Sequence, residues 1–124
     1  MWRKIFVFFF LIITSAVQAE EFPFTQQRFS ELQQQDRPIL VFIHADWCPT
    51  CKKQGIILNE LFERDEFKPL TVLKVDFDSQ KPVVNSFGAK YQSTLIIFRG
   101  NREKGRVTAS TDRKEIAALL RRVL

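Results

Sequence analysis

The sequence is poor in residues that bind metals or form disulfides, with two cysteines and one histidine among 124 residues. A self-contained tetrahedral zinc site needs about four Cys, His or carboxylate ligands, and a disulfide-stapled small protein needs more than one bridge, so both classes are excluded. Hydrophobic residues make up 45% and charged residues 27%, which argues against a disordered chain, a collagen and a multi-pass membrane protein. The chain has the length of one domain, and its cysteines are interpreted as a pair.

The first 19 residues have the layout of a secretory signal. Basic Arg3 and Lys4 precede an apolar run from Ile5 to Ile13, and small or polar residues follow up to Ala19. The apolar run is much shorter than the roughly 20 residues that span a bilayer as a helix, so a permanent anchor is the weaker alternative. We expect cleavage after Ala19, which leaves a domain of residues 20–124. That domain is predicted to be periplasmic or otherwise exported, with no stable membrane insertion.

The positive charge is concentrated near the C-terminus. Residues 99–124 contain eight Lys or Arg against three acidic residues, within a chain of net charge +5. A nucleic-acid surface would interleave basic residues with exposed aromatics, and Phe98 at the edge of this segment is the only aromatic there. We therefore predict a solvated basic face and no nucleic-acid partner, with an acidic protein or an anionic membrane surface as an additional possibility.

The hydrophobic periodicity alternates between helical and extended along residues 20–124. Four strands are predicted, over Ile39–His44, Thr71–Phe77, Thr94–Phe98 and Arg106–Ala109. Helices are predicted from about Thr25 to residues 36–38, from Cys48, over Pro82–Phe87, and from Thr111 or Asp112 with Asp112 and Glu115 as a capping box. The pattern predicts an α/β fold with a central, mixed, four-stranded sheet flanked by helices on both faces.

The two cysteines lie where a predicted buried strand gives way to a helix, in Ala45-Asp46-Trp47-Cys48-Pro49-Thr50-Cys51-Lys52. At a helix N-terminus, free N–H groups and the helix dipole stabilise a thiolate, which predicts a lowered pKa and a nucleophilic role for Cys48. Cys51 follows one turn later and is predicted to lie deeper, as the resolving thiol. Pro49 restricts the loop between them.

A static disulfide is the alternative interpretation of this pair. Such a bridge closes a very short loop, so it removes far less chain entropy than the ~3 kcal/mol expected for a loop of about 15 residues. Half of a zinc site is a second alternative, but the other half is missing from the sequence. Redox chemistry is therefore the favoured interpretation.

These segments resemble a thioredoxin-fold protein over the whole of residues 20–124. The resemblance rests on the strand and helix around Trp47-Cys48-Pro49-Thr50-Cys51, on Lys74-Val75-Asp76, and on Ser93-Thr94-Leu95-Ile96-Ile97-Phe98-Arg99-Gly100. With the export signal, the chain most resembles periplasmic thioredoxin-like proteins, including the C-terminal domain of the transmembrane thiol:disulfide interchange reductase. The resemblance implies that Cys48 exchanges with the partner's sulfur and Cys51 resolves the mixed disulfide. It implies site-shaping roles for Trp47, Pro49, Thr50, Ser93, Thr94 and Lys74.

The sequence departs from the thioredoxin pattern at two positions. Ser93 stands where the family usually has a cis-proline, so we expect a trans Gln92–Ser93 peptide and a loop of different shape, which bears on partner choice and metal exclusion. The alternative is that Ser93 is tolerated with a similar backbone placement. Phe42 stands where the family commonly has a buried Asp, so Lys74 lacks a carboxylate from that strand. Lys74 is expected to reach solvent or to favour the Cys51 thiolate.

The sequence thus predicts an exported thiol–disulfide oxidoreductase, more as a reductase than as an oxidant, without a cofactor. Its predicted partners are protein thiols and disulfides and a membrane thiol reductase, and the domain is predicted to be a monomer. A copper- or metal-handling protein is the alternative, with Cys48, Cys51 and His44 as ligands. A binding module whose cysteines form only a bridge is a third possibility.

Overall fold

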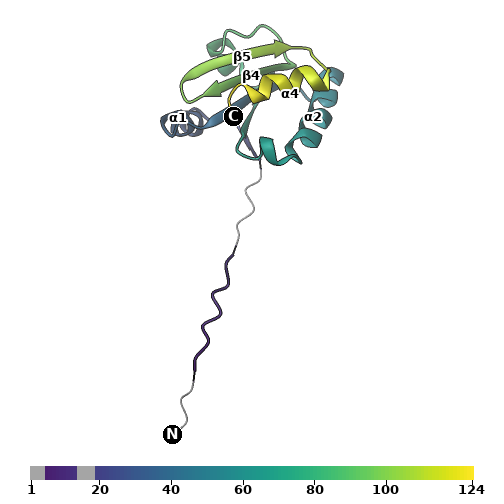
Figure 1. Cartoon of the computed structure of the whole chain (residues 1–124). Helices are drawn as coiled ribbons and strands as arrows, with labels where there is room; N and C mark the ends of the chain where they lie inside the picture. The colour runs from purple at the N-terminus through teal and green to yellow at the C-terminus, as the bar shows by residue number, and fades with distance from the viewer. Residues whose placement is uncertain (1–4, 14–18) are drawn as a thin grey trace.

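The computed structural model describes residues 5–13 and 19–124. Its centre is one five-stranded sheet in the order β1-β3-β2-β4-β5 (Figure 1). The three strands β1, β3 and β2 run parallel, β4 is antiparallel to β2, and β5 is antiparallel to β4. The strands are β1 (Glu20–Pro23), β2 (Pro38–His44), β3 (Thr71–Asp76), β4 (Thr94–Arg99) and β5 (Arg102–Thr108).

The sheet has one strand more than the four predicted from the sequence. The missed strand, β1, contains two glutamates and a proline in four residues, a composition that is depleted in strands. It forms because it lies at the sheet edge and pairs with β3, from Glu20 opposite Thr71 to Pro23 opposite Lys74. The other edge strand, β5, is longer than the predicted Arg106–Ala109, and its charged residues suit an exposed edge.

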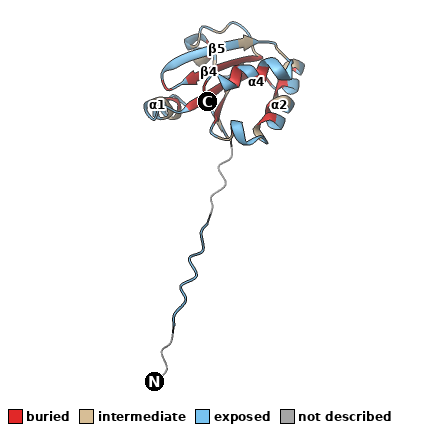
Figure 2. Cartoon of the chain, in the orientation of Figure 1, coloured by how far each residue is buried: buried red, intermediate tan, exposed pale blue. Residues whose placement is uncertain are grey.

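Helices cover both faces of the sheet, as the sequence predicts. The helices are α1 (Gln26–Gln34), α2 (Pro49–Phe62), α3 (Lys81–Ser86) and α4 (Arg113–Arg121), with a short 3-10 helix η1 (Asp65–Phe67). Helices α2 and α4 share one hydrophobic core with one face of the sheet, and α1 and α3 share the other. Figure 2 shows the buried strands between exposed outer helix surfaces.

Strand β2 lies at the centre and contributes to both cores. Leu40 and Phe42 belong to the core under α2 and α4, whereas Ile39, Val41 and Ile43 belong to the core under α1 and α3. Each of these side chains is at most 4% exposed. Burial of one such side chain contributes about 1.5–3 kcal/mol, so β2 is a rigid base for the segment that follows it.

Helix α4 begins at a side-chain cap. Asp112 Oδ1 accepts hydrogen bonds from the N–H groups of Lys114 at 2.9 Å and Glu115 at 3.4 Å. The predicted capping box is only half formed, because Glu115 Oε2 accepts from the Ser110 hydroxyl at 2.8 Å, while the Asp112 N–H donates to that hydroxyl's oxygen at 3.3 Å. The cap fixes the start of α4 at Arg113.

Residues 5–13 lie outside the packed domain. They have no regular secondary structure, and their large apolar side chains are exposed, from 74% at Val7 to 90% at Phe9 (Figure 1). In the part of the chain that is described, none of the helices has the length and apolar character needed to cross a membrane. Residues 14–18, which carry most of the predicted cleavage signal, lie outside the described residues.

The Asp112 cap gives a direct test of this account of α4. Asp112→Ala removes the acceptor for two N–H groups, and we expect a loss of about 1 kcal/mol in the free energy of unfolding. Urea denaturation measures the change as a lower midpoint at constant slope. The matched control is Thr111→Ala at the exposed preceding position, which is expected to change stability by no more than about 0.5 kcal/mol. Equal stability of the two variants would contradict the capping role.

Candidate functional site

Cys48 is the N-cap residue of α2. Strand β2 ends at His44, the Cys48 N–H donates to the Ala45 carbonyl at 3.1 Å, and Pro49 occupies the first turn of the helix. The Cys48 sulfur accepts a hydrogen bond from the Cys51 N–H at 3.1 Å. A sulfur that caps a helix in this way gains the partial positive charge of the helix N-terminus, which stabilises a thiolate.

Ser93 lies against both sulfurs. Its Oγ is 3.1 Å from Cys48 Sγ and 3.1 Å from Cys51 Sγ. The Gln92–Ser93 peptide is trans, which confirms the prediction, and Ser93 has a φ of 59° in the left-handed region. The residue precedes β4 and is 3% exposed. The serine that replaces the family's usual proline therefore places a hydroxyl at the centre of the site.

Gln54 holds the Ser93 segment against α2, and the sequence analysis missed it. Its Nε2 donates to the Ser93 carbonyl at 3.0 Å and to the Ser110 carbonyl at 3.0 Å. The side chain is fully buried, and its Oε1 has no hydrogen-bond partner among the described residues. The available signal was a glutamine three residues after Cys51, on the helix side that faces the core.

The two thiols have opposite pKa shifts. Burial acts to raise the pKa of Cys48, but hydrogen bonds from the Cys51 side chain, from Ser93 and from the Cys51 N–H outweigh it and lower the pKa below its ordinary value. Burial, and then the hydrogen bond that Cys51 gives to Cys48, raise the pKa of Cys51. Both thiols are almost inaccessible to solvent, with Cys48 2% and Cys51 4% exposed. Cys51 lies deeper among the surrounding atoms than Cys48, as predicted.

The remaining predicted residues of the motif surround the pair. Trp47 is 58% exposed, and its Nε1 donates to Asp78 Oδ2 at 2.7 Å. Pro49 is exposed and Thr50 half-buried at the start of α2. Thr94 is buried, and its hydroxyl donates to the Tyr91 carbonyl at 2.8 Å rather than to a cysteine. Thr94 thus contacts the loop, whereas Trp47 presents an aromatic surface beside Cys48.

Lys74 has a carboxylate partner that the sequence analysis did not foresee. Its Nζ lies 3.2 Å from Glu21 Oε1 on β1, which pairs with β3. Phe42 is buried in the core at the position opposite Lys74 in the β2–β3 register. The largest causes of the Cys51 pKa shift are burial, Cys48, Ser93 and Ala45, so the expected action of Lys74 on the Cys51 thiolate stays a prediction.

His44 does not join the cysteines. Its ring packs against Phe42 with centroids 5.6 Å apart. Within residues 5–13 and 19–124, no group of three or more His, Cys, Asp or Glu side chains is placed to hold a metal ion. The alternative metal site of Cys48, Cys51 and His44 therefore has no geometric support in the described part of the chain.

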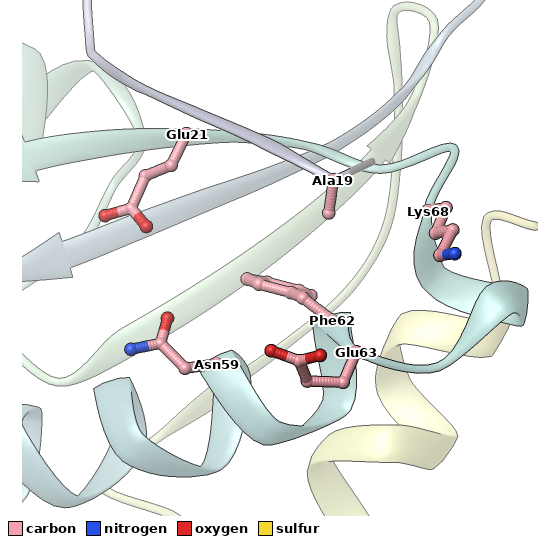
Figure 3. Close-up of a pocket in the computed structure, with 6 residues that line it drawn as sticks. All are labelled: Ala19, Glu21, Asn59, Phe62, Glu63 and Lys68. Carbon is pink, nitrogen blue, oxygen red and sulfur yellow. The ribbon is translucent and has the colours of Figure 1, made fainter. Parts of the chain in front are cut away.

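Pockets lie along α2, and two of them differ in how close they are to the cysteines. One of about 190 Å³ lies beside Cys51 and is lined by Phe42, His44, Ala45, Asp46, Cys51, Lys52, Gly55 and Lys74. Figure 3 shows another of about 460 Å³, lined by Ala19 and Glu21, by Asn59, Phe62 and Glu63 near the end of α2, and by Lys68. None of these six residues is a predicted site residue, so the second pocket is separate from the dithiol.

Comparison with known proteins identifies the family. The family model for thioredoxin matches residues 20–122. The chain belongs to the thioredoxin family. The thioredoxin of Alicyclobacillus acidocaldarius is 31% identical over 100 residues, which cover 81% of this chain and 94% of that protein. The crystal structure of Trxlp from Edwardsiella tarda matches with a TM-score of 0.78 at 36% identity, over 82% of this chain and 98% of that chain.

Thioredoxin family membership settles the reaction class. Thioredoxin 1 of Nostoc sp. is 27% identical over 112 residues, which cover 90% of this chain and all of that protein. Thioredoxins are disulfide oxidoreductases that act on protein disulfides, and this chain is a dithiol oxidoreductase with Cys48 and Cys51 as its Cys-x-x-Cys pair. The predicted thioredoxin fold is confirmed, with five strands in place of four.

His44 gives the site a predicted pH dependence of stability. Burial, followed by the charge of Lys74, lowers the pKa of His44 from 6.5, so the folded state binds the proton less readily than the unfolded state. The stability that neutral His44 contributes is therefore present above pH 6.5 and is lost as the pH falls from 6.5 through the lower, folded pKa. We expect His44→Gln to weaken the decline of unfolding free energy in that window, measured by urea denaturation at a series of pH values.

Lys74→Met is the companion variant for this prediction. Removing the positive charge raises the pKa of His44, which NMR titration of the imidazole measures directly. An unchanged His44 pKa in Lys74→Met, or an unchanged pH profile in His44→Gln, contradicts the electrostatic account.

Proposed function

We propose that this thioredoxin-family oxidoreductase is an exported reductase of protein disulfides, with Cys48 as the attacking thiol and Cys51 as the resolving thiol. The observation that carries the assignment of roles is the opposite pKa shift of the two cysteines. The thiolate is the nucleophile in thiol–disulfide exchange, so the cysteine with the lowered pKa attacks first. The cysteine with the raised pKa keeps its proton until the mixed disulfide has formed.

The reaction occurs in two steps of exchange. Cys48 thiolate attacks one sulfur of the partner's disulfide, forms a mixed disulfide and releases the other partner sulfur as a thiolate, which takes up a proton. Cys51 then loses its proton and attacks Cys48 Sγ, which releases the remaining partner sulfur. The partner gains two electrons and two protons, and Cys48 and Cys51 are oxidised to a disulfide.

The reducing direction is supported by the similarity of the chain to thioredoxins. The thioredoxin pair has a potential of about −270 mV, whereas strong oxidants near about −120 mV owe their potential to a strongly stabilised reduced form. A membrane thiol reductase that returns electrons to Cys48 and Cys51 completes the proposed cycle.

Export is supported by the N-terminal segment and by the point where the domain begins. The nine apolar residues of 5–13 pack against nothing in the described chain. The first strand starts at Glu20, directly after the predicted cleavage position at Ala19. Cleavage there removes no residue of the sheet, so the exported domain keeps all five strands.

The surface beside Cys48 fits a protein partner. Trp47 is 58% and Tyr91 is 64% exposed, and they precede Cys48 and Ser93 by one and two residues. Exposed aromatic side chains are favoured in protein interfaces, because they bury a large contact area and lose little conformational entropy on binding. We infer that a monomeric domain docks its partner here, with the partner's disulfide placed over Cys48.

The direction of electron flow is tested by the redox potential of the Cys48–Cys51 pair. Equilibration with a glutathione redox series is expected to give a value near the about −270 mV of thioredoxin. A value near the about −120 mV of a strong oxidant contradicts the reductase assignment. Reduction of insulin disulfides is expected to vanish in Cys48→Ser, and persisting activity in that variant would rule out Cys48 as the nucleophile.

Export and partner are tested together by a trapping experiment in the native cell. Cys51→Ser leaves the mixed disulfide at Cys48 unresolved, so the expected product is a covalent complex with the partner in the exported fraction. Amino-terminal sequencing of the trapped protein is expected to begin at Glu20. The double variant Cys48→Ser/Cys51→Ser is the control and traps nothing. Trapped complexes that carry residues 1–19 and remain in the cytoplasm would contradict the export proposal.

A further inference from the structure

The Ser93 hydroxyl is placed to exchange protons with both thiols. A hydroxyl has one donor and two acceptor positions. In the reduced site the Ser93 hydroxyl donates to the Cys48 thiolate, and the Cys51 thiol also gives its hydrogen bond to Cys48. Once Cys48 is bonded to the partner it carries no thiolate, and the Cys51 thiol then has Ser93 Oγ as its acceptor. Its distances of 3.1 Å to the two sulfurs are equal. Among the described residues, Ser93 is the side chain with hydrogen bonds to both Cys48 and Cys51.

The burial of the site favours an internal proton carrier. Cys48, Cys51 and Ser93 are 2%, 4% and 3% exposed, and the side chains that line the pocket beside Cys51 make no hydrogen bond to its sulfur. Phe42 offers no proton acceptor at the position where the family commonly has an aspartate. Lys74 is paired with Glu21. The resolving thiol nevertheless has to lose its proton in order to attack.

We propose that Ser93 is a catalytic residue of the exchange, with its hydroxyl carrying the Cys51 proton away as Cys51 attacks the mixed disulfide. The proposal rests on the proposed function, because it concerns the resolving step of that reaction. In this step the Cys51–Cys48 S–S bond forms, the bond from Cys48 to the partner's sulfur breaks, and the departing sulfur keeps the electron pair. The Cys51 proton passes to Ser93 Oγ, and the proton of Ser93 passes to the departing sulfur.

The departing sulfur lies no more than about 5 Å from Ser93 Oγ, a separation that one bridging water molecule spans. It is bonded to Cys48 Sγ at about 2.05 Å in the mixed disulfide, and Cys48 Sγ lies 3.1 Å from the hydroxyl. Ser93 ends the step with one proton, as it began. The pair of cysteines has lost two electrons and the partner has gained them, so no further reactant is required.

The backbone of Ser93 is fixed for this role. Its carbonyl accepts from the Ala109 N–H at 2.9 Å and from Gln54 Nε2 at 3.0 Å. Because Gln54 and Cys51 lie on the same helix, the hydroxyl and the resolving thiol are held within one hydrogen-bonded unit. Gln54 is therefore a positioning residue, which explains a fully buried amide whose Oε1 is left without a partner.

Four other titratable side chains lie near Cys51. The pocket beside it is lined by His44 of β2, Asp46 of the following loop, Lys52 of α2 and Lys74 of β3. None of these four side chains is hydrogen-bonded to a sulfur in the described structure, and none is among the largest causes of the Cys51 pKa shift. The pH dependence of the resolving step is therefore assigned to the Cys51 thiol, which hydrogen-bonds to Ser93.

The test follows a single turnover with an aryl disulfide whose released thiolate is coloured, with the full-length protein in excess. Attack by Cys48 releases the first thiolate, and attack by Cys51 releases the second in a concentration-independent phase. In Ser93→Gly, which tolerates a φ of 59°, and in Ser93→Ala, we expect the second phase at neutral pH to slow on the order of a hundredfold. The deficit is expected to shrink as the pH rises past the Cys51 pKa, where solvent removes the proton.

Thr108→Val is the matched control, since it removes a hydroxyl that reaches the same loop through Thr94 and touches neither sulfur. We expect it to match the wild-type rates. A second phase unchanged in both Ser93 variants, or slowed by the same factor at every pH, overturns the proposal and leaves the proposed function standing. Absence of any thiolate release by the wild-type protein contradicts the proposed function itself.

Discussion

The site depends on one constraint, the contact of a single hydroxyl with two buried sulfurs. Ser93 Oγ lies 3.1 Å from Cys48 and from Cys51. Its hydroxyl acts to lower the pKa of both thiols, and the hydrogen bond that Cys51 gives to Cys48 separates them by lowering the pKa of Cys48 and raising that of Cys51. The helix cap at Cys48 acts in the same direction, because the Cys51 N–H also donates to the Cys48 sulfur. Without this difference between the two pKa values, two thiols three residues apart would have no assigned order of attack.

The fold holds Ser93 against the two sulfurs. Central strand β2 ends immediately before the cysteines, and its burial on both faces fixes where α2 begins. Gln54 then joins α2 to the Ser93 loop and to Ser110, which precedes α4, across 39 and 56 residues of sequence. Packing of α2 and α4 on the same sheet face therefore supports the geometry of a site that lies at their N-terminal ends.

The sequence predicts the parts of this structure that local patterns encode. The dithiol at a strand-to-helix junction, the trans Ser93 peptide and the alternation of strands and helices follow from short-range spacing and residue type. Strand β1 was missed because its four residues lack a strand composition, and the Lys74–Glu21 ion pair was missed with it. Ser93 was predicted to shape the site, but its hydrogen bonds to both sulfurs and its link to Gln54 join distant segments, which no periodicity in a single sequence reveals.

The most direct measurement of the central claim is an NMR titration of the reduced wild-type protein with isotope-labelled cysteine, in which the Cβ resonances report Cys48 and Cys51 separately. The account predicts that Cys48 titrates below and Cys51 above the ordinary thiol pKa of 9.0. Titration of Cys51 before Cys48, or of both thiols together at the ordinary value, would contradict it.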